Sequence, residues 1–229
     1  MTTIFGLRHP KVDLALLAAD RQITINGRGQ DPEKDLEGRK LCLSDNQMYA
    51  FGCSGVYDRG TASLAADMRT GKLDVEKILR EGKFPELREL NLSRLGDEVP
   101  YMDRLSNFII ISRFNGDPKL HACFPLGKVE QRIWTQIGSG SSKVADYMDG
   151  LSKVSEARSY LGEKRPTNSD DVIRVGLEAV RYAQGKDIYS SGLDMIVLTP
   201  NSAVDCFSQL QENFDRKIKG VQKQVKKSL

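Results

Sequence analysis

Short apolar runs near the start of the chain predict β-strands. Each run is rich in β-branched or aliphatic residues and is bounded by charged residues or glycine, which is typical of strands. The runs are residues 4–7, 14–19, 21–25, 40–43 and 48–53. The last two flank Ser44-Asp45-Asn46, a sequence that favours a tight turn, so we expect them to form a hairpin.

Helical spacing replaces the strand pattern after these runs. Apolar residues at intervals of three and four predict one helix over residues 62–69 and a second over residues 74–80. Residues 83–105 carry Pro85 and Pro100 and mixed charges without a clear period. We interpret this stretch as a connection or an insertion.

Strands and helices both return in the second half. Further strands are predicted over residues 108–112, 120–124 and 129–137, the first two joined by the turn sequence Asn115-Gly116-Asp117-Pro118. Amphipathic helices are predicted over residues 144–154 and 172–183, the latter after the capping cluster Asn168-Ser169-Asp170. A last hairpin, 195–199 with 203–207, turns at Pro200-Asn201-Ser202 and precedes a helix from about Gln209.

The order of these elements favours an α+β protein. Several strands precede two helices, then come further strands, two helices, two strands and one helix. Such runs do not suit a sheet of βαβ units, in which strands and helices alternate singly. They suit antiparallel sheets packed on each other, with helix pairs outside. We expect a single domain over residues 1–229, with 211–229 as a basic helical extension, solvated rather than bound to nucleic acid.

Composition and charge narrow the classes of function. The 229 residues are 39% hydrophobic and 28% charged, which is ordinary for a globular protein with a core. A net charge of +3, from 34 basic and 31 acidic residues, is too balanced to indicate nucleic acid as the main partner. No apolar run approaches the ~18–20 residues that span a bilayer, and the N-terminal residues lack the layout of a signal peptide. We therefore expect a cytoplasmic protein with no membrane partner.

Histidine and cysteine offer little for catalysis or metal binding. The four cysteines are scattered without a C-x-x-C pair, and the two histidines, His9 and His121, each lie in a strand-like stretch. A histidine-ligated metal or a Ser-His pair has little to build on. We expect no cofactor, and an enzyme with this sequence needs another general base.

Thr2 offers such a base. The initiator methionine is normally removed when a small residue follows, which would make Thr2 the first residue. An α-amine with a pKa of about 7.7–8.0 is partly neutral at physiological pH and can accept the proton of the Thr2 hydroxyl. Many proteins start with Met-Thr, so this feature alone indicates little.

Other polar positions are equally weak when taken singly. Asp20 ends an apolar strand, where an aspartate that starts a turn is the simpler interpretation. Lys40 opens another buried-looking strand, and an interior lysine needs a counter-ion, for which Asp20 is a candidate. Two strand-to-helix loops, Gly52-Cys53-Ser54-Gly55 and Gly138-Ser139-Gly140-Ser141-Ser142, have N–H groups that can bind an oxyanion or a phosphate, although the second lacks the ending of a P-loop.

Taken in order, these residues resemble the pattern of proteasome β-subunits. The pattern consists of Thr2-Thr3, Ala18-Ala19-Asp20, Arg39-Lys40-Leu41, the two glycine loops, and Asp187-Ile188-Tyr189-Ser190-Ser191-Gly192. It covers residues 2 to about 210, and the order of strands and helices is similar too. The resemblance implies an N-terminal-nucleophile hydrolase, a threonine endopeptidase. It also implies the fold of that class, a four-layer αββα sandwich of two antiparallel sheets flanked by helix pairs.

The resemblance assigns catalytic roles to named residues. It implies that Thr2 is both nucleophile and amine base, and that Asp20 and Lys40 are the pair that activates it. Three residues would hold and orient the terminal amine and its attendant water: Ser139, Asp187 and Ser190.

Further roles concern the substrate and the partners. The N–H of Ser54 would join that of Thr2 in the oxyanion hole, and Thr24 and Gly52 would bind substrate, with Gly52 leaving a deep pocket. The implied partners are a peptide or unfolded protein as substrate and further copies in stacked heptameric or hexameric rings. Other ring subunits or an ATPase are further candidate partners, between which the sequence does not decide.

Some positions depart from the family pattern. Arg21 follows Asp20 directly, Ser54 stands where glycine is customary, and the segments that separate Thr2, Asp20 and Lys40 are each a few residues longer than usual. The Met-Thr-Thr start is more like the bacterial ATP-dependent relative, and Asp-x-x-Ser is more like the proteasome proper. Two alternatives stay open: a catalytically silent ring or assembly subunit, and a specialised amidase or transpeptidase that passes the acyl group to an amine.

Overall fold

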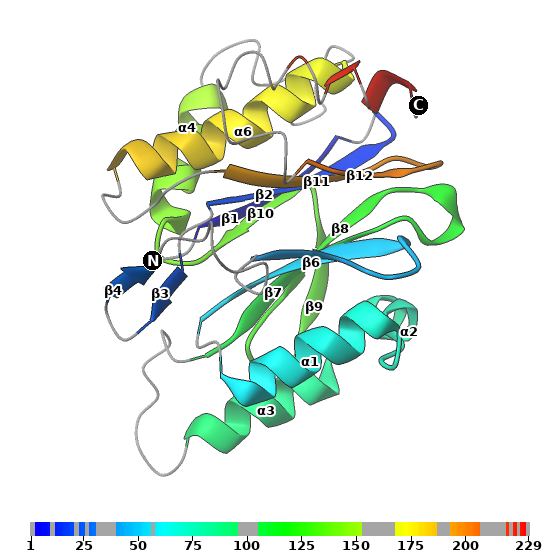
Figure 1. Ribbon diagram of the computed structural model, residues 1–229, viewed down its shortest axis with the longest axis vertical. Coiled ribbons are helices and arrows are strands. Elements are labelled where there is room, and N and C mark those ends of the chain that lie inside the picture. The colour runs from blue at the N-terminus through cyan, green and yellow to red at the C-terminus, as the bar shows by residue number, and fades with distance from the viewer. Residues whose placement is uncertain are drawn as a thin grey trace.

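We describe a computed structural model of the chain (Figure 1). The residues that the structure describes are 3–9, 12–20, 23–25, 28–30, 40–55, 58–95, 105–152, 168–186, 193–206, 219, 222–223 and 225–227. Side chains are described in these ranges except at 23–25, 28–30, 150–152 and 184–186.

Two five-stranded antiparallel sheets form the centre of the molecule. The first has the order β10-β1-β2-β11-β12 and the second the order β5-β6-β7-β8-β9. The strands of the first sheet are β1 (Ile4–His9), β2 (Leu14–Asp20), β10 (Trp134–Ile137), β11 (Leu193–Leu198) and β12 (Ala203–Asp205). Those of the second are β5 (Leu41–Leu43), β6 (Tyr49–Ser54), β7 (Asn107–Ser112), β8 (Lys119–Cys123) and β9 (Val129–Arg132). A separate two-stranded ribbon pairs β3 (Ile23–Ile25) with β4 (Arg28–Gln30).

The helices fall into two groups along the chain. The first group contains α1 (Arg59–Thr70), α2 (Val75–Glu81) and α3 (Pro85–Leu95), and the second contains α4 (Ser141–Ser152) and α6 (Ser169–Lys186). A short 3₁₀ turn, η3 (Phe114–Gly116), joins β7 to β8. Side chains cap the helix starts: Asp58 accepts from the Thr61 N–H, and Asn168 accepts from the Asp171 N–H. Figure 1 shows α4 and α6 side by side near β2 and β11, and α1 and α3 side by side near β7 and β9.

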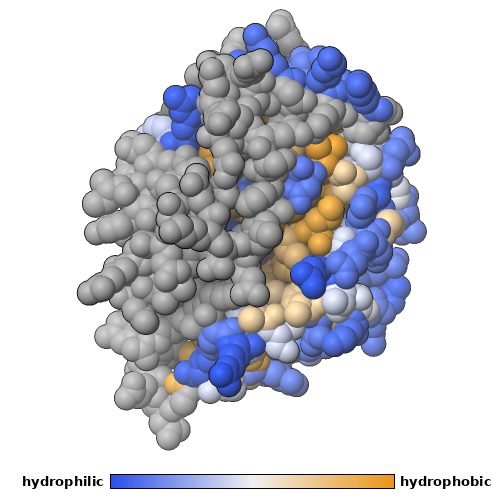
Figure 2. Space-filling model, viewed as in Figure 1, coloured by the Kyte–Doolittle hydropathy of each residue, from blue (hydrophilic) through white to orange (hydrophobic). Residues whose placement is uncertain are grey.

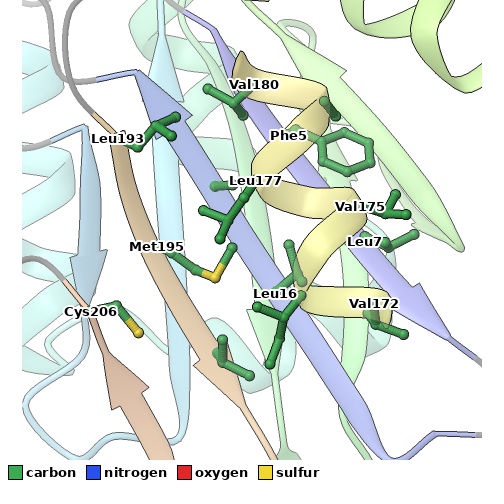
Figure 3. Close-up of a cluster of buried hydrophobic side chains, with 14 of the residues drawn as sticks. Phe5, Leu7, Leu16, Val172, Val175, Leu177, Val180, Leu193, Met195 and Cys206 are labelled. Atoms are coloured by element: carbon green, nitrogen blue, oxygen red, sulfur yellow. The ribbon is translucent and has the colours of Figure 1, made fainter. Parts of the chain in front are cut away.

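Alternation along the strands divides the core into three clusters of buried side chains. In β2, which is buried throughout, Leu16 and its same-face neighbours belong to the cluster that contains side chains of α4 and α6, and Figure 3 shows Leu16 beside α6. Leu17 and its neighbours belong to the third cluster. The second cluster joins α1, α2 and α3 to β6–β9. The third contains side chains from the strands of both sheets and none from the helices. The sheets approach closely there, because a Cβ built on Gly6 of β1 would lie 2.6 Å from Leu120 Cδ1 of β8.

Most of the predicted strands and helices are present, and two predictions were wrong. Residues 83–105 were interpreted as a connection, yet α3 occupies 85–95. Pro85 begins this helix, a position where proline is favoured. The buried face of α3 includes a polar residue, Asn91, which is 0% exposed. A search for apolar periodicity misses a helix whose packed face is partly polar.

The second wrong prediction concerns the stretch 129–137. It was expected to be one strand, but it forms two strands that belong to different sheets, β9 and β10, with only Ile133 between them. The carbonyl of Ile133 accepts a hydrogen bond from the Arg8 N–H of β1 (2.7 Å), which ties the crossover to the first sheet. No glycine or proline marks this break in the sequence.

The described residues of the C-terminal extension contact α6. Val225 is fully buried in the cluster with α4 and α6, so the expectation of a solvated helix does not hold for this residue. Gln222 donates to the carbonyl of Asp170, and Lys226 pairs with the Asp170 carboxylate at 2.5 Å.

The described surface is mostly hydrophilic. In Figure 2, the largest group of hydrophobic residues lies near the middle of the face shown, and hydrophilic residues cover most of the rest of its coloured part. The large hydrophobic side chains that are exposed on the described surface are Leu92, Phe124, Leu126 and Ile133. Within the part of the chain that the structure describes, no helix is both long and apolar enough to cross a membrane.

Candidate active site

The carboxylate of Asp20 is buried next to the start of the chain. Asp20 is the last residue of β2, is 0% exposed, and pairs in register with Leu193 of β11. Its N–H donates to the Thr3 carbonyl (3.1 Å), and its Oδ1 accepts a hydrogen bond from the Thr3 N–H (2.5 Å). This carboxylate therefore holds the peptide that links Thr3 to position 2.

Lys40 supplies the second partner of Asp20. Its Nζ donates to Asp20 Oδ2 at 2.6 Å, with the two side chains only 6% and 0% exposed. The ion pair that we expected from the sequence is thus confirmed. Because Lys40 directly precedes β5 and Asp20 ends β2, the pair joins the two sheets. A buried ion pair costs desolvation energy and adds little net stability, so stability alone does not account for it.

The loop of Gly138, Ser139 and Gly140 lies directly against Thr3. A Cβ built on Gly140 would lie 1.9 Å from Thr3 Oγ1, so no other residue fits here without displacing Thr3. Gly138, at φ +99°, turns the chain out of β10, and the Ser141 N–H donates to its carbonyl where α4 begins. Ser139 stands between Gly138 and Gly140 in this loop, so the structure brings it near Thr3.

Strand register directs the N–H groups at the end of β6. The Cys53 N–H donates to the Lys40 carbonyl (3.4 Å) on the β5 side. Successive N–H groups of a strand point to opposite sides, so that of Ser54 points toward β7, where Ser54 is in register with Asn107. By the same alternation we infer that the Gly55 N–H returns to the side of Lys40. The role of Ser54 in an oxyanion hole stays a prediction, and Gly55, which the sequence analysis did not single out, becomes a second candidate for it.

Gly55 has a conformation that explains its identity. Its φ is +103°, and a Cβ on it would lie 2.0 Å from the carbonyl oxygen of Leu105. Glycine is required on both counts. Two positions before Gly55, burial raises the pKa of the Cys53 thiol to about 12, an effect that Arg94 opposes and Asp58 reinforces, which makes this thiol a poor nucleophile.

Packing explains why residue 52 is a glycine. Its missing Cβ would lie 2.9 Å from Leu41 Cδ2 and 3.0 Å from two carbon atoms of Ile4, so these core side chains fill the space that we expected to be an open pocket. The contact of Gly52 with substrate stays a prediction. Thr24 lies on β3, in register with Gly29, and its side chain is outside the described residues.

Three predicted site residues, Thr2, Asp187 and Ser190, lie outside the described residues. A scan against models of known protein families finds no match, and neither does a search of curated proteins. Among the described residues, no group of three or more His, Cys, Asp or Glu side chains gathers as a metal site would require.

The arrangement has a definite chemical capacity. A buried carboxylate fixes an ammonium group and the amide of Thr3 on its two oxygens. The positive charge of Lys40 is thereby held near the first residues of the chain. A cation in such a position stabilises a nearby alkoxide and the neutral form of a nearby amine, and so lowers the pKa of each.

Proposed function

We propose that this chain is an N-terminal-nucleophile hydrolase of the proteasome β-subunit type, a threonine peptidase that acts through Thr2. The observation that carries the proposal is the convergence of the Thr3 N–H and the Lys40 ammonium on the buried carboxylate of Asp20. The Gly138–Gly140 loop against Thr3 supports it as well, because the resemblance assigns Ser139 to the same site.

In the proposed reaction the Thr2 hydroxyl attacks the carbonyl carbon of a peptide bond. The free α-amine of Thr2 accepts the hydroxyl proton and passes it to the leaving amine as the C–N bond breaks. This leaves an acyl ester on Thr2, and a water molecule then hydrolyses the ester to a carboxylic acid and the free hydroxyl. The reaction requires that Met1 be absent, because an acylated amine cannot act as the base.

The negative oxygen of the tetrahedral intermediate needs N–H donors. We propose the Gly55 N–H for this role, in place of that of Ser54, because the alternation along β6 directs it toward the side of Lys40. Asp187 and Ser190, with Ser139, remain proposed as the residues that orient the amine and its water.

The proposal extends to the fold and the assembly. The arrangement proposed is the four-layer αββα sandwich. Two observations support it: the third cluster contains side chains from both sheets and none from helices, and each of the other two clusters joins helices to one sheet. We also propose a ring of identical copies. The subunit composition of the purified ring would reveal any other subunits. The proposed substrate is a peptide or an unfolded protein.

The nucleophile is tested with the full chain and three measurements. The first is the mass of the N-terminal peptide, the second is hydrolysis of N-acyl tripeptidyl coumarin amides, and the third is labelling by a tripeptide vinyl sulfone. We expect a wild-type chain that begins at Thr2 and gains one label there. Thr2→Ala should lose hydrolysis and labelling, whereas Thr2→Ser, which keeps a hydroxyl and an amine, should retain part of both.

Other results would decide against the proposal. Full hydrolysis by the Thr2→Ala variant would exclude Thr2 as the nucleophile. A native chain that retains Met1 and takes no label would instead favour a catalytically silent ring subunit. Ligated product on addition of a peptide amine would identify a transpeptidase.

A further inference from the structure

The guanidinium of Arg94, near the end of α3, makes five hydrogen bonds, one for each N–H that the group possesses. Two of them form a fork on the Asp58 carboxylate, with Nη2 at 2.6 Å from Oδ1 and Nε at 3.1 Å from Oδ2. The other three go to Thr61 Oγ1 (2.6 Å), Ser106 Oγ (2.7 Å) and Asn91 Oδ1 (3.2 Å). We call these five residues the Arg94 cluster.

The Arg94 cluster joins three segments that are distant in sequence. Asp58 and Thr61 belong to the start of α1, Asn91 and Arg94 to α3, and Ser106 to the residues just before β7. Thr61, Asn91 and Ser106 are each 0% exposed. Buried polar groups cost free energy unless they are bonded, and here each is bonded to another member of the cluster. The Asp58 side chain is 44% exposed, but the other side chains anchor the cluster in the interior.

The Arg94 cluster is bonded both to the backbone on which Gly55 packs and to Asp58, which follows Gly55 in the chain. The Asn91 side chain makes two hydrogen bonds to the Ser106 backbone. Its Oδ1 accepts from the Ser106 N–H (2.8 Å), and its Nδ2 donates to the Ser106 carbonyl (2.9 Å). Gly55 packs on the same backbone, since a Cβ on it would lie 2.0 Å from Leu105 O and 3.0 Å from Ser106 Cα. Along the chain, Asp58 follows Gly55 by three positions and is held by the Arg94 fork.

We propose that Arg94 is a positioning residue that orients the peptide between Ser54 and Gly55, so that its N–H faces the reacting carbonyl. This inference rests on the proposed function, because it assigns that N–H to the oxyanion hole. Arg94 acts through the start of α1 and through the Leu105–Ser106 backbone. A misdirected N–H cannot stabilise the oxyanion, and the loss of one such donor costs about 10²–10³ in kcat.

Arginine suits this position for its shape as well as its charge. A lysine keeps the positive charge but has three donors on a single nitrogen, so it cannot reproduce the fork on Asp58 together with the bonds to Ser106 and Asn91. A role through geometry and a role through charge therefore predict different results for Arg94→Lys.

The test compares Arg94→Gln, Arg94→Lys and wild type, with Arg88→Gln as the control because Arg88 is an exposed arginine on the same helix. Hydrolysis of tripeptidyl coumarin amides requires an oxyanion hole, whereas addition of Thr2 to a tripeptide vinyl sulfone forms no tetrahedral oxyanion. We expect both Arg94 variants to lose roughly tenfold or more in kcat with KM within about twofold, and to keep labelling within about twofold. Arg88→Gln should match wild type in each assay.

Hydrogen exchange of the folded variants provides a readout that does not depend on activity. The peptide that covers residues 53–60 should exchange faster in both Arg94 variants, and peptides from β1 and β2 should be unchanged. Unchanged exchange at 53–60 overturns the inference, and so does rescue of kcat by Arg94→Lys. Equal losses of hydrolysis and labelling also overturn it, since they indicate a general structural role. If wild type itself neither hydrolyses nor takes the label, the proposed function fails, and unaltered exchange then rejects the positioning role separately.

Discussion

A lysine ammonium buried beside a carboxylate gains attraction but loses hydration, and the balance is close to zero when both partners are present. The pair of Asp20 and Lys40 is of this kind, at 2.6 Å and with almost no exposure. Its contribution to stability is therefore much smaller than the penalty for removing one member. That asymmetry makes the pair a sensitive point for mutation.

We expect Lys40→Met to lower the free energy of unfolding by about 3 kcal/mol or more, because Asp20 is left buried without its cation, and to abolish peptide hydrolysis. Urea unfolding and the coumarin-amide assay measure the two effects. Lys72→Met is the matched control, since Lys72 pairs with Asp67 at 3.5 Å but is 75% exposed, and it should cost less than about 1 kcal/mol. Adding Asp20→Asn to Lys40→Met should recover part of the stability. Strictly additive losses would contradict this account.

A second residue-scale prediction concerns pH. His121 on β8 is 6% exposed, and burial, with the charge of Lys119 as a smaller cause, lowers its pKa from 6.5 to about 4. Between these values the unfolded chain binds a proton that the folded chain does not, so this group costs stability as the pH falls below 6.5. We expect a loss of roughly 2 kcal/mol from His121 between about pH 7 and pH 5.

Urea unfolding at the two pH values, on wild type and His121→Leu, measures this contribution. The leucine variant has no proton to bind there, so its stability should fall less over the same interval. Equal falls in the two proteins would show that other groups cause the acid sensitivity.

At the scale of elements, the loop between β10 and α4 is closely constrained by its contact with Thr3. We expect Gly140→Ala to reduce both activity and stability, since its Cβ would lie 1.9 Å from Thr3 Oγ1 next to the bonds that Asp20 makes. Gly176→Ala in α6 is the control. Its Cβ would meet only the end of the flexible Leu16 side chain, at 2.6 Å from Cδ1, and alanine favours a helix. Adding Thr3→Ala to Gly140→Ala should restore stability in part, and failure to do so would argue against the contact.

The elements also show what sequence could and could not predict. Strand and helix positions follow from local spacing, as in β2 and α1, and the partner of Lys40 follows from the cost of a buried unpaired charge. The helix α3 could not be found in this way because Asn91 and Arg94 on it are held by polar bonds to distant residues. The contact of Gly55 with Leu105 is equally invisible, because it joins residues that only the tertiary fold brings together.

At the scale of the whole molecule, the described part of the C-terminal extension is attached through an apolar and a charged contact. We expect Val225→Ala to lower the free energy of unfolding by roughly 1–3 kcal/mol, because Val225 is fully buried in the cluster with α6. Lys226→Ala should lower the free energy of unfolding by less than about 1 kcal/mol, because Lys226, which pairs with Asp170, has a side chain that is 59% exposed. Thermal or urea unfolding checks both values. A larger effect from Lys226 than from Val225 would show that charge, not burial, holds the extension.

The position of Asp20 between distant strands has a consequence for timing. Its strand β2 is hydrogen-bonded to β1 along one edge and to β11 along the other. The ammonium that pairs with Asp20 belongs to Lys40, just before β5 of the other sheet. Pairing of strands so far apart in sequence is a late and slow event in folding, because a long loop must close first. The pair of Asp20 and Lys40 can therefore be fully enclosed only after β11, which begins at Leu193, has joined β2. If the proposed function holds, a chain that still lacks β11 would therefore not yet have a complete site.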